Sequence, residues 1–292
     1  MILFRSVLAL TVAVGLAACG GRTSGLMNDT GAAEKKGDAD ALVTAGDELW
    51  NSRGDRAAAE GAIAKWTEAS VVDPTRADIP LKLSRAYYFL AIAHVRWEKD
   101  PDDKLKALYL KGVEAGERAI KLESPAFAAK IKGGAKWPEA VKSVELSGIA
   151  GLYWYATNLG RWGLLEGITA ILAHKDDIFA IMEHVRALDE TFFHGAPHRY
   201  FGVYWAKLPF GKDLNKSKTH FEKAMGISGN YLETKVLFAE YYAAYSDDEA
   251  LFKKVLNEVL TVADDVDPTI TPENINAKRT AKYMLANVAD FF

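Results

Sequence analysis

The chain has 292 residues, of which 49% are hydrophobic and 11% aromatic, and its 36 basic and 39 acidic residues give a formal net charge of −3. This apolar content is sufficient for a large buried core. The charge pattern argues against a nucleic-acid partner, because phosphate binding calls for clustered Lys and Arg and the sequence has no basic run or stripe. A single cysteine excludes an intrachain disulfide, so stability must come from ordinary packing.

The first 18 residues have the pattern of a secretory signal. One positive charge, Arg5, precedes about ten apolar residues, which is shorter than the roughly 20 that a membrane-spanning helix needs. The Leu-Ala-Ala-Cys stretch that ends at Cys19 resembles the bacterial lipobox, in which the chain is cut before the cysteine and the thiol is acylated with a fatty acid such as palmitate. We therefore expect residues 1–18 to be a lipoprotein signal peptide and Cys19 to be the lipidation site.

Residues 19–38 contain the small, polar and glycine-rich sequence GRTSGLMNDTGAAEKKGD, which predicts a flexible tether after the lipidated cysteine. A random coil of this length reaches about 25 Å. Gly20, at the second mature position, lacks the aspartate that is associated with inner-membrane retention. This favours the outer membrane, with the folded domain on the periplasmic face of the cell envelope.

Residues 39–292 predict one domain that is helical almost throughout. Apolar residues recur at spacings of one, three and four, as on one face of a helix. The clearest examples are Ile178, Phe179, Ile181, Met182, Val185 and Leu188, followed by Leu251, Phe252, Val255, Leu256, Val259, Leu260 and Ala263. Runs of period two with hairpin turns are absent, so we expect little or no sheet.

The predicted helices come in pairs. In AIAKWTEASVVDP, Ala62, Trp66, Ala69 and Pro74 have the small, aromatic, small, proline spacing of the second helix of a tetratricopeptide unit. YLKGVEAGERAIKLESP and NKSKTHFEKAMGISGN carry degenerate versions of the same pattern. The predicted units are 39–72, 80–124, 139–189, 197–226 and 230–264, followed by a last helix from about Pro272 to Phe291.

These pairs predict an all-α fold of tetratricopeptide-like helical hairpins, an α-solenoid, with a C-terminal capping helix. Such stacks present the first helix of each pair on a concave surface. A generic helical bundle is the alternative.

The sequence carries no catalytic signature and no cofactor motif. His194 and His198 lack the helix-borne H-E-x-x-H arrangement and have no acidic cluster beside them, which argues against a zinc site. Gly195 and Pro197 indicate that His194 lies in a connection and that the next helix starts near Pro197. Asp176 and the residue after it are expected to cap the helix that follows them.

Three stretches carry more polar and aromatic residues than packing requires, namely GLYWYATNLGRWG, FFHGAPHRYFGVYW with His198, Arg199 and Tyr204, and NINAKRTAKYM. On a helix, Trp154, Asn158 and Arg161 share one face, and Asn276, Arg279 and Tyr283 share another. Aromatic surface with an amide and a guanidinium suits an organic anion, because arginine binds a carboxylate at two points. The alternative is that the aromatic residues are core and that the polar groups cap or pair.

We hypothesise that Arg161 and Arg279 face one cavity. The candidate ligand-binding residues are Trp154, Asn158, Arg161, His198, Arg199, Tyr204, Asn276 and Arg279.

In order along the chain, the lipobox at Cys19, GLYWYATNLGRWG, FFHGAPHRYFGVYWAKLP, HFEKAMGISGNYLETKVLFAEYYA and PENINAKRTAKYML resemble the T-component (TatT) family of tripartite ATP-independent periplasmic (TRAP) transporters. The resemblance spans about residues 40–292. It implies divergent tetratricopeptide-like helix pairs and a lipid-anchored homotrimer. It also implies a partnership with the periplasmic substrate-binding subunit of a transporter for organic acids or more hydrophobic ligands. It carries over no defined ligand site.

Two other functional classes stay open. A general periplasmic scaffold for envelope assembly would use the same repeats to bind peptides. A hydrolase would need a nucleophile and a base brought together from distant repeats.

Overall fold

The computed structural model describes residues 24–27, 37–208 and 210–292, and this part of the chain is helical without any β-strand. The signal peptide and Cys19 lie outside the described residues. The α-helices are α1 (Ala39–Asn51), α2 (Arg56–Val72), α3 (Asp78–Ala93), α4 (Asp102–Glu123), α5 (Pro125–Lys132), α6 (Trp137–Ala140), α7 (Ile149–Glu166), α8 (Ile168–Leu188), α9 (Phe192–Lys207), α10 (Leu214–Ile227), α11 (Glu233–Leu237), α12 (Glu249–Thr261) and α13 (Thr271–Ala286).

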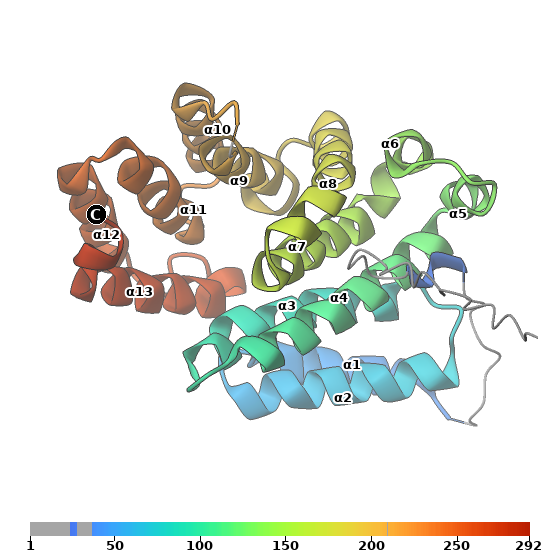
Figure 1. Cartoon of the computed structure of the whole chain (residues 1–292). Helices are drawn as coiled ribbons and strands as arrows, with labels where there is room; N and C mark the ends of the chain where they lie inside the picture. The colour runs from blue at the N-terminus through green and yellow to red at the C-terminus, as the bar shows by residue number, and fades with distance from the viewer. Residues whose placement is uncertain (1–23, 28–36, 209) are drawn as a thin grey trace, which may run out of the picture.

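Successive helices pack as hairpins, which confirms the predicted all-α fold (Figure 1). The pairs are α1 with α2, α3 with α4, α7 with α8, and α9 with α10. In the fifth pair, α11 continues into the π-helix η5 (Phe238–Ala243), which packs against α12. The third pair differs in its start, because the short helices α5 and α6 precede α7. This arrangement is compatible with the predicted solenoid, and α13 lies at its C-terminal end.

Small residues allow the two helices of a pair to approach closely. Trp66 of α2 is 1% exposed, and a Cβ at Gly46 of α1 would lie 2.4 Å from its indole nitrogen. In the fourth pair, Phe221 of α10 is fully buried, and a Cβ at Gly202 of α9 would lie 2.7 Å from its ring. The predicted pattern of aromatic and small residues therefore reflects a packing contact that recurs between pairs.

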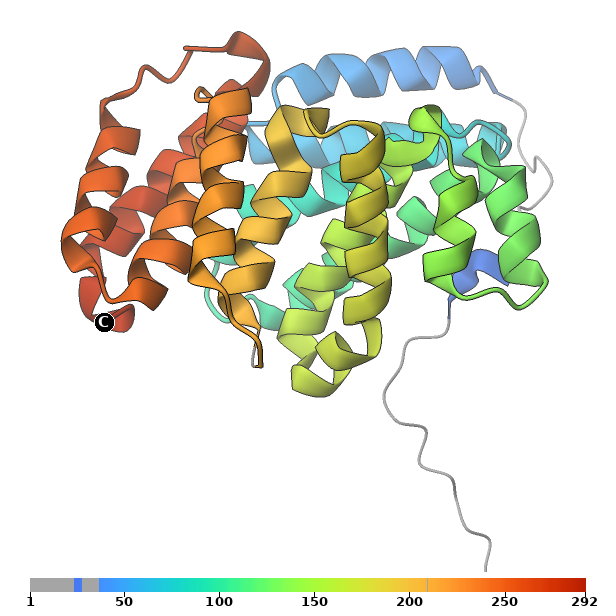
Figure 2. The ribbon, with the colours of Figure 1, turned by 90° about the horizontal axis from the view of Figure 1, so that it is seen from above.

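Part of the segment expected to be a tether is bound to the folded domain. Gly25–Met27 forms the 3-10 helix η1, which contacts α4 and α5. Leu26 is 6% exposed and belongs to the same core cluster as Phe127 of α5. Figure 2 shows η1, in dark blue, beside this helix.

Among the described helices, none is both long and apolar enough to cross a membrane.

Candidate functional site

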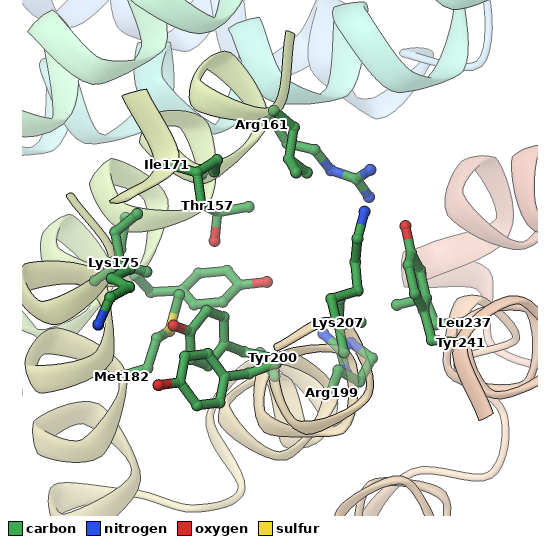
Figure 3. Close-up of a pocket in the computed structure, with 18 of the residues that line it drawn as sticks. Thr157, Arg161, Ile171, Lys175, Met182, Arg199, Tyr200, Lys207, Leu237 and Tyr241 are labelled. Atoms are coloured by element: carbon green, nitrogen blue, oxygen red, sulfur yellow. The ribbon is translucent and has the colours of Figure 1, made fainter. Parts of the chain in front are cut away.

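A cavity of about 400 Å³ lies among the third, fourth and fifth helix pairs (Figure 3). The first helices of the pairs supply most of its wall, and α8 covers one side. Its lining consists of Tyr88, Tyr153, Ala156, Thr157, Gly160, Arg161, Leu164, Gly167, Ile168, Ile171, Leu172, Lys175, Ile178, Met182, Phe193, Ala196, Arg199, Tyr200, Val203, Tyr204, Lys207, Leu208, Tyr231, Glu233, Leu237 and Tyr241.

Most of this wall is apolar or aromatic. Ile178 and Met182 of α8 are buried, at 4% and 1% exposed, and face the rings of α9. Leu164, Ile168 and Leu172, around the turn between α7 and α8, are instead 45%, 63% and 48% exposed. The apolar lining therefore continues from the interior of the cavity to the surface of the protein.

The polar side of the cavity holds two cations, Arg161 and Lys207, that form no ion pair with a described residue. Figure 3 shows Arg161 of α7 and Lys207 of α9 extending toward one another, with Tyr241 of η5 beside them. Among the described residues, neither side chain has an ion-pair partner, and the ammonium group of Lys207 lies 5.3 Å from the ring centre of Tyr241. Burial lowers the pKa of Lys207, the carboxylate of Glu240 opposes this shift, and the charge of Arg161 adds to it. An anion placed between the two side chains would satisfy both of them.

The other charged residues of the lining have partners. Lys175 forms an ion pair with Asp176 at 2.7 Å. The carboxylate of Glu233 accepts a hydrogen bond from the Tyr231 hydroxyl at 3.0 Å. The guanidinium of Arg199 donates hydrogen bonds to two backbone carbonyls. Of the four cations in the lining, only Arg161 and Lys207 are therefore available to a ligand.

Arg199 holds the start of α9 in an unusual backbone conformation. Phe193, His194 and Gly195 have φ values of 42°, 60° and 73°, in the left-handed region that costs non-glycine residues free energy. The guanidinium of Arg199 donates hydrogen bonds to the carbonyls of Phe193, at 2.8 Å, and of His194. It also lies 4.3 Å from the ring centre of Tyr231. Regular helix begins only after Gly195, as the sequence predicted.

The two histidines of this region have separate environments. The Nδ1 atom of His194 lies 3.0 Å from the Ser228 hydroxyl, and its ring stacks on Tyr231. His198 is buried, with its Nδ1 atom 2.9 Å from Nδ1 of His220 and its Nε2 atom 3.1 Å from Glu190. Within the described part of the chain, no group of three or more His, Cys, Asp or Glu side chains is arranged to hold a metal ion.

Two predicted site residues on α7 belong to the core. Trp154 is 5% exposed and packs against Tyr88 and Phe193. Asn158 is fully buried, and its amide nitrogen donates to the backbone carbonyls of Ser84 and Trp154 at 3.1 and 2.8 Å. At about 100° per residue, the cavity face of α7 is centred on Thr157 and Leu164, so Arg161 lies at its edge and Asn158 points toward α3.

Asn276 and Arg279 lie outside the cavity. They belong to α13, where Asn276 is buried and accepts a hydrogen bond from the Trp97 indole at 3.4 Å. Arg279 is exposed, and its guanidinium lies 4.3 Å from the ring centre of the same tryptophan. The structure does not place Arg279 beside Arg161, because α13 packs mainly on α12, α11 and α3 rather than on α7. Of the eight predicted residues, the cavity lining contains Arg161, Arg199 and Tyr204.

The sequence analysis did not identify Lys207, the second cation that lies beside Arg161 in the cavity. The spacing of Tyr200, Val203, Tyr204 and Lys207 places all four on one face of α9, and this spacing could have revealed the lysine. Tyr241 could not have been found in this way, because it lies in a π-helix whose register differs from that of an α-helix.

Comparison with known families matches residues 64–292 to the model for the TRAP transporter T-component, TAtT. The chain belongs to this family. The matched region begins within α2 and includes every element that lines the cavity. No curated protein gives a significant match. A T-component is part of a transport system of the cell envelope, and the family is not a known class of enzyme.

Proposed function

We propose that this T-component is anchored by a lipid on Cys19 at the periplasmic face of the envelope, in the outer membrane. There it binds the substrate-binding subunit of a TRAP transporter and holds an organic acid with an apolar body in the cavity. The observation that carries the ligand assignment is the convergence of Arg161 and Lys207, which form no ion pair with a described residue, on a cavity whose wall is mostly apolar or aromatic.

A carboxylate would supply the ion-pair partner that Arg161 and Lys207 lack among the described residues. The planar guanidinium of Arg161 presents paired donors to two carboxylate oxygens, and the ammonium group of Lys207 adds a further donor. The apolar side chains of α8, including Ile171, Ile178 and Met182, would enclose the hydrocarbon part of the ligand. The volume of about 400 Å³ falls within the range of roughly 300–1,000 Å³ that is typical of small-molecule sites.

The test compares apolar carboxylic acids with their methyl esters in an equilibrium binding assay. Each pair has nearly the same shape and apolar surface, so a difference in affinity reports the charge. We expect the acids to bind and the esters to bind at least about tenfold more weakly, because a hydrogen bond to a charged group contributes about 1.5–3 kcal/mol. Equal affinity of the acid and the ester would contradict the assignment.

The partner assignment is supported by membership of the T-component family. Its test is to crosslink native membranes, capture the tagged lipidated protein and identify the co-purifying proteins by mass spectrometry. Recovery of a periplasmic solute-binding subunit is expected. The proposed homotrimer rests on the family resemblance, and the mass of the purified particle in solution checks it.

A further inference from the structure

Residues 24–27, the N-terminal described segment, are bound to the folded domain at α4 and α5. The Ser24 hydroxyl donates a hydrogen bond to a carboxylate oxygen of Glu117 at 2.7 Å, and the Gly25 N–H donates to the other oxygen at 3.0 Å. Leu26, the next residue, is buried against α4 and α5. Ser24 is therefore attached to the domain beside α5.

This attachment shortens the connection to the lipid that we propose on Cys19. The two positions are 5 residues apart, and a chain extends at most about 3.6 Å per residue, so Ser24 lies within about 18 Å of the acylated cysteine in any conformation. If η1 were not bound, the first residue attached to the domain would be Gly37. The largest possible distance from Cys19 to the domain would then be about 65 Å. The end of the molecule that carries η1 must therefore stay close to the bilayer.

This same end of the molecule carries exposed positive charge. Lys130, Lys132, Lys136 and Lys142, on and after α5, are all exposed and form no ion pair with a described residue. The sequence from 125 to 148 contains only two acidic residues, Glu139 and Glu145. This segment therefore has the opposite sign to the chain as a whole, whose net charge is −3, and the acidic residue from another helix that interacts with Lys136 is Asp177 of α8.

We propose that these four lysines, together called the basic face, are the surface with which the anchored protein lies on an anionic bilayer. The inference depends on the lipid anchor of the proposed function. Lysines close to an anionic membrane surface are each attracted by about 1 kcal/mol, which corresponds to about fivefold in partitioning. The tether brings the face to the bilayer, and the phosphates of the lipid headgroups hold it there.

The test uses the full lipidated chain in vesicles of phosphatidylethanolamine and phosphatidylglycerol. Because the thiol of Cys19 is acylated, a single introduced cysteine reports accessibility to a membrane-impermeant maleimide. Ala129, on α5, and Ala286, on α13, are both exposed, and α13 lies at the other end of the molecule from α5 in Figures 1 and 2, so the reporters are Ala129→Cys and Ala286→Cys. We expect labelling at 129 to be at least about fivefold slower on vesicles than in detergent, and labelling at 286 to be unchanged.

Charge-matched variants separate the basic face from the lipid anchor. Changing Lys130, Lys132, Lys136 and Lys142 together to glutamine should restore fast labelling at position 129. The control changes Lys99, Lys223, Lys254 and Lys282, which are also exposed and form no ion pair with a described residue, to glutamine. In this control, labelling at position 129 should remain slow on vesicles. Leu26→Ser, which removes the buried anchor of η1, should weaken the protection.

Equal labelling rates at positions 129 and 286 on these vesicles would overturn the inference. The ligand and partner assays above would be unaffected, so this failure is distinguishable from failure of the proposed function. An intact mass without an acyl group on Cys19 in the same preparation would overturn both the anchor and the basic face as a membrane surface. Protection that persists on vesicles of neutral phosphatidylcholine would also contradict the role assigned to the lysines.

Discussion

The guanidinium of Arg53, in the turn between α1 and α2, donates hydrogen bonds to both carboxylate oxygens of Glu273 in α13, at 3.1 and 2.7 Å and across 220 residues of sequence. The two side chains are only 6% and 4% exposed. Arg85 approaches the same carboxylate at 3.3 Å. This buried cluster joins the first hairpin to the last helix, and so it links the two ends of the repeat array.

We predict that Glu273→Ala destabilises the protein by about 3–5 kcal/mol, because it leaves two arginines near a buried site without their carboxylate. Urea unfolding measures the effect. Glu60→Ala is the matched control, since Glu60 pairs with Arg56 at 2.8 Å but both side chains are about half exposed. The control should change stability by less than about 1 kcal/mol. Similar losses in the two variants would contradict the structural role of Glu273.

The close packing of α9 on α10 gives a second prediction. Gly202→Ala adds a Cβ 2.7 Å from the fully buried ring of Phe221, so it should cost about 1–3 kcal/mol through overpacking. Gly226→Ala, in α10, meets no atom within 4 Å and should instead stabilise the helix by about 0.5–1 kcal/mol. Thermal unfolding of the two variants should therefore shift in opposite directions.

A third prediction concerns the cations of the cavity. Arg161→Gln and Lys207→Gln should each weaken binding of an apolar carboxylate by about tenfold to a hundredfold, because each removes a charge-assisted hydrogen bond. Arg279→Gln removes the same charge from an exposed site outside the lining and should leave the affinity unchanged. Calorimetric titration of the three variants measures this. An effect of Arg279→Gln as large as that of Arg161→Gln would count against the cavity as the binding site.

Acid sensitivity provides a fourth prediction. Burial, followed by the neighbouring His198, lowers the pKa of His220 to about 4, from about 6.5 in the unfolded chain. Because the fold favours neutral His220, this contribution to stability is complete above pH 6.5 and is lost as the pH falls from about 6.5 to about 4. Partial exposure of the ring limits it to about 1–2 kcal/mol.

His220→Asn removes this titration while keeping a polar side chain beside His198. The wild type should therefore lose about 1–2 kcal/mol more stability than the variant between pH 7 and pH 4. Urea unfolding at both pH values measures this double difference, in which the shared titration of the carboxylates cancels. An identical loss in the two proteins would show that His220 does not titrate as the structure indicates.

The all-α fold could be predicted from the sequence because the spacing of apolar residues indicates which side of each helix is buried. Trp66 and Phe221, chosen from their spacing, are indeed buried against glycines of the preceding helices. The residue that caps the start of a helix is harder to predict from the local sequence. Asp176 was expected to precede a helix, yet it lies inside α8, since the break occurs earlier, at Gly167 with a φ of 112°. An aspartate on an exposed helical surface resembles a cap in sequence.

The candidate site was only partly predictable. Arg161 and Arg199 were identified from their aromatic neighbours, but the same pattern also selected Asn158, which is a core hydrogen-bonding residue. A face shared on one helix shows which residues lie together, but not which neighbouring helix they meet. The pairing of Arg161 with Lys207 depends on how α7 and α9 pack, and that information is spread over both hairpins.

The most direct test of the central claim is native mass spectrometry of the protein purified from its own membranes, without added ligand. The account predicts a bound carboxylic acid with an apolar body, one per chain, that is absent from the combined Arg161→Gln and Lys207→Gln variant and retained by Arg279→Gln. A ligand retained unchanged by the double variant, or a wild-type protein that carries no ligand and binds no carboxylate on titration, would contradict it.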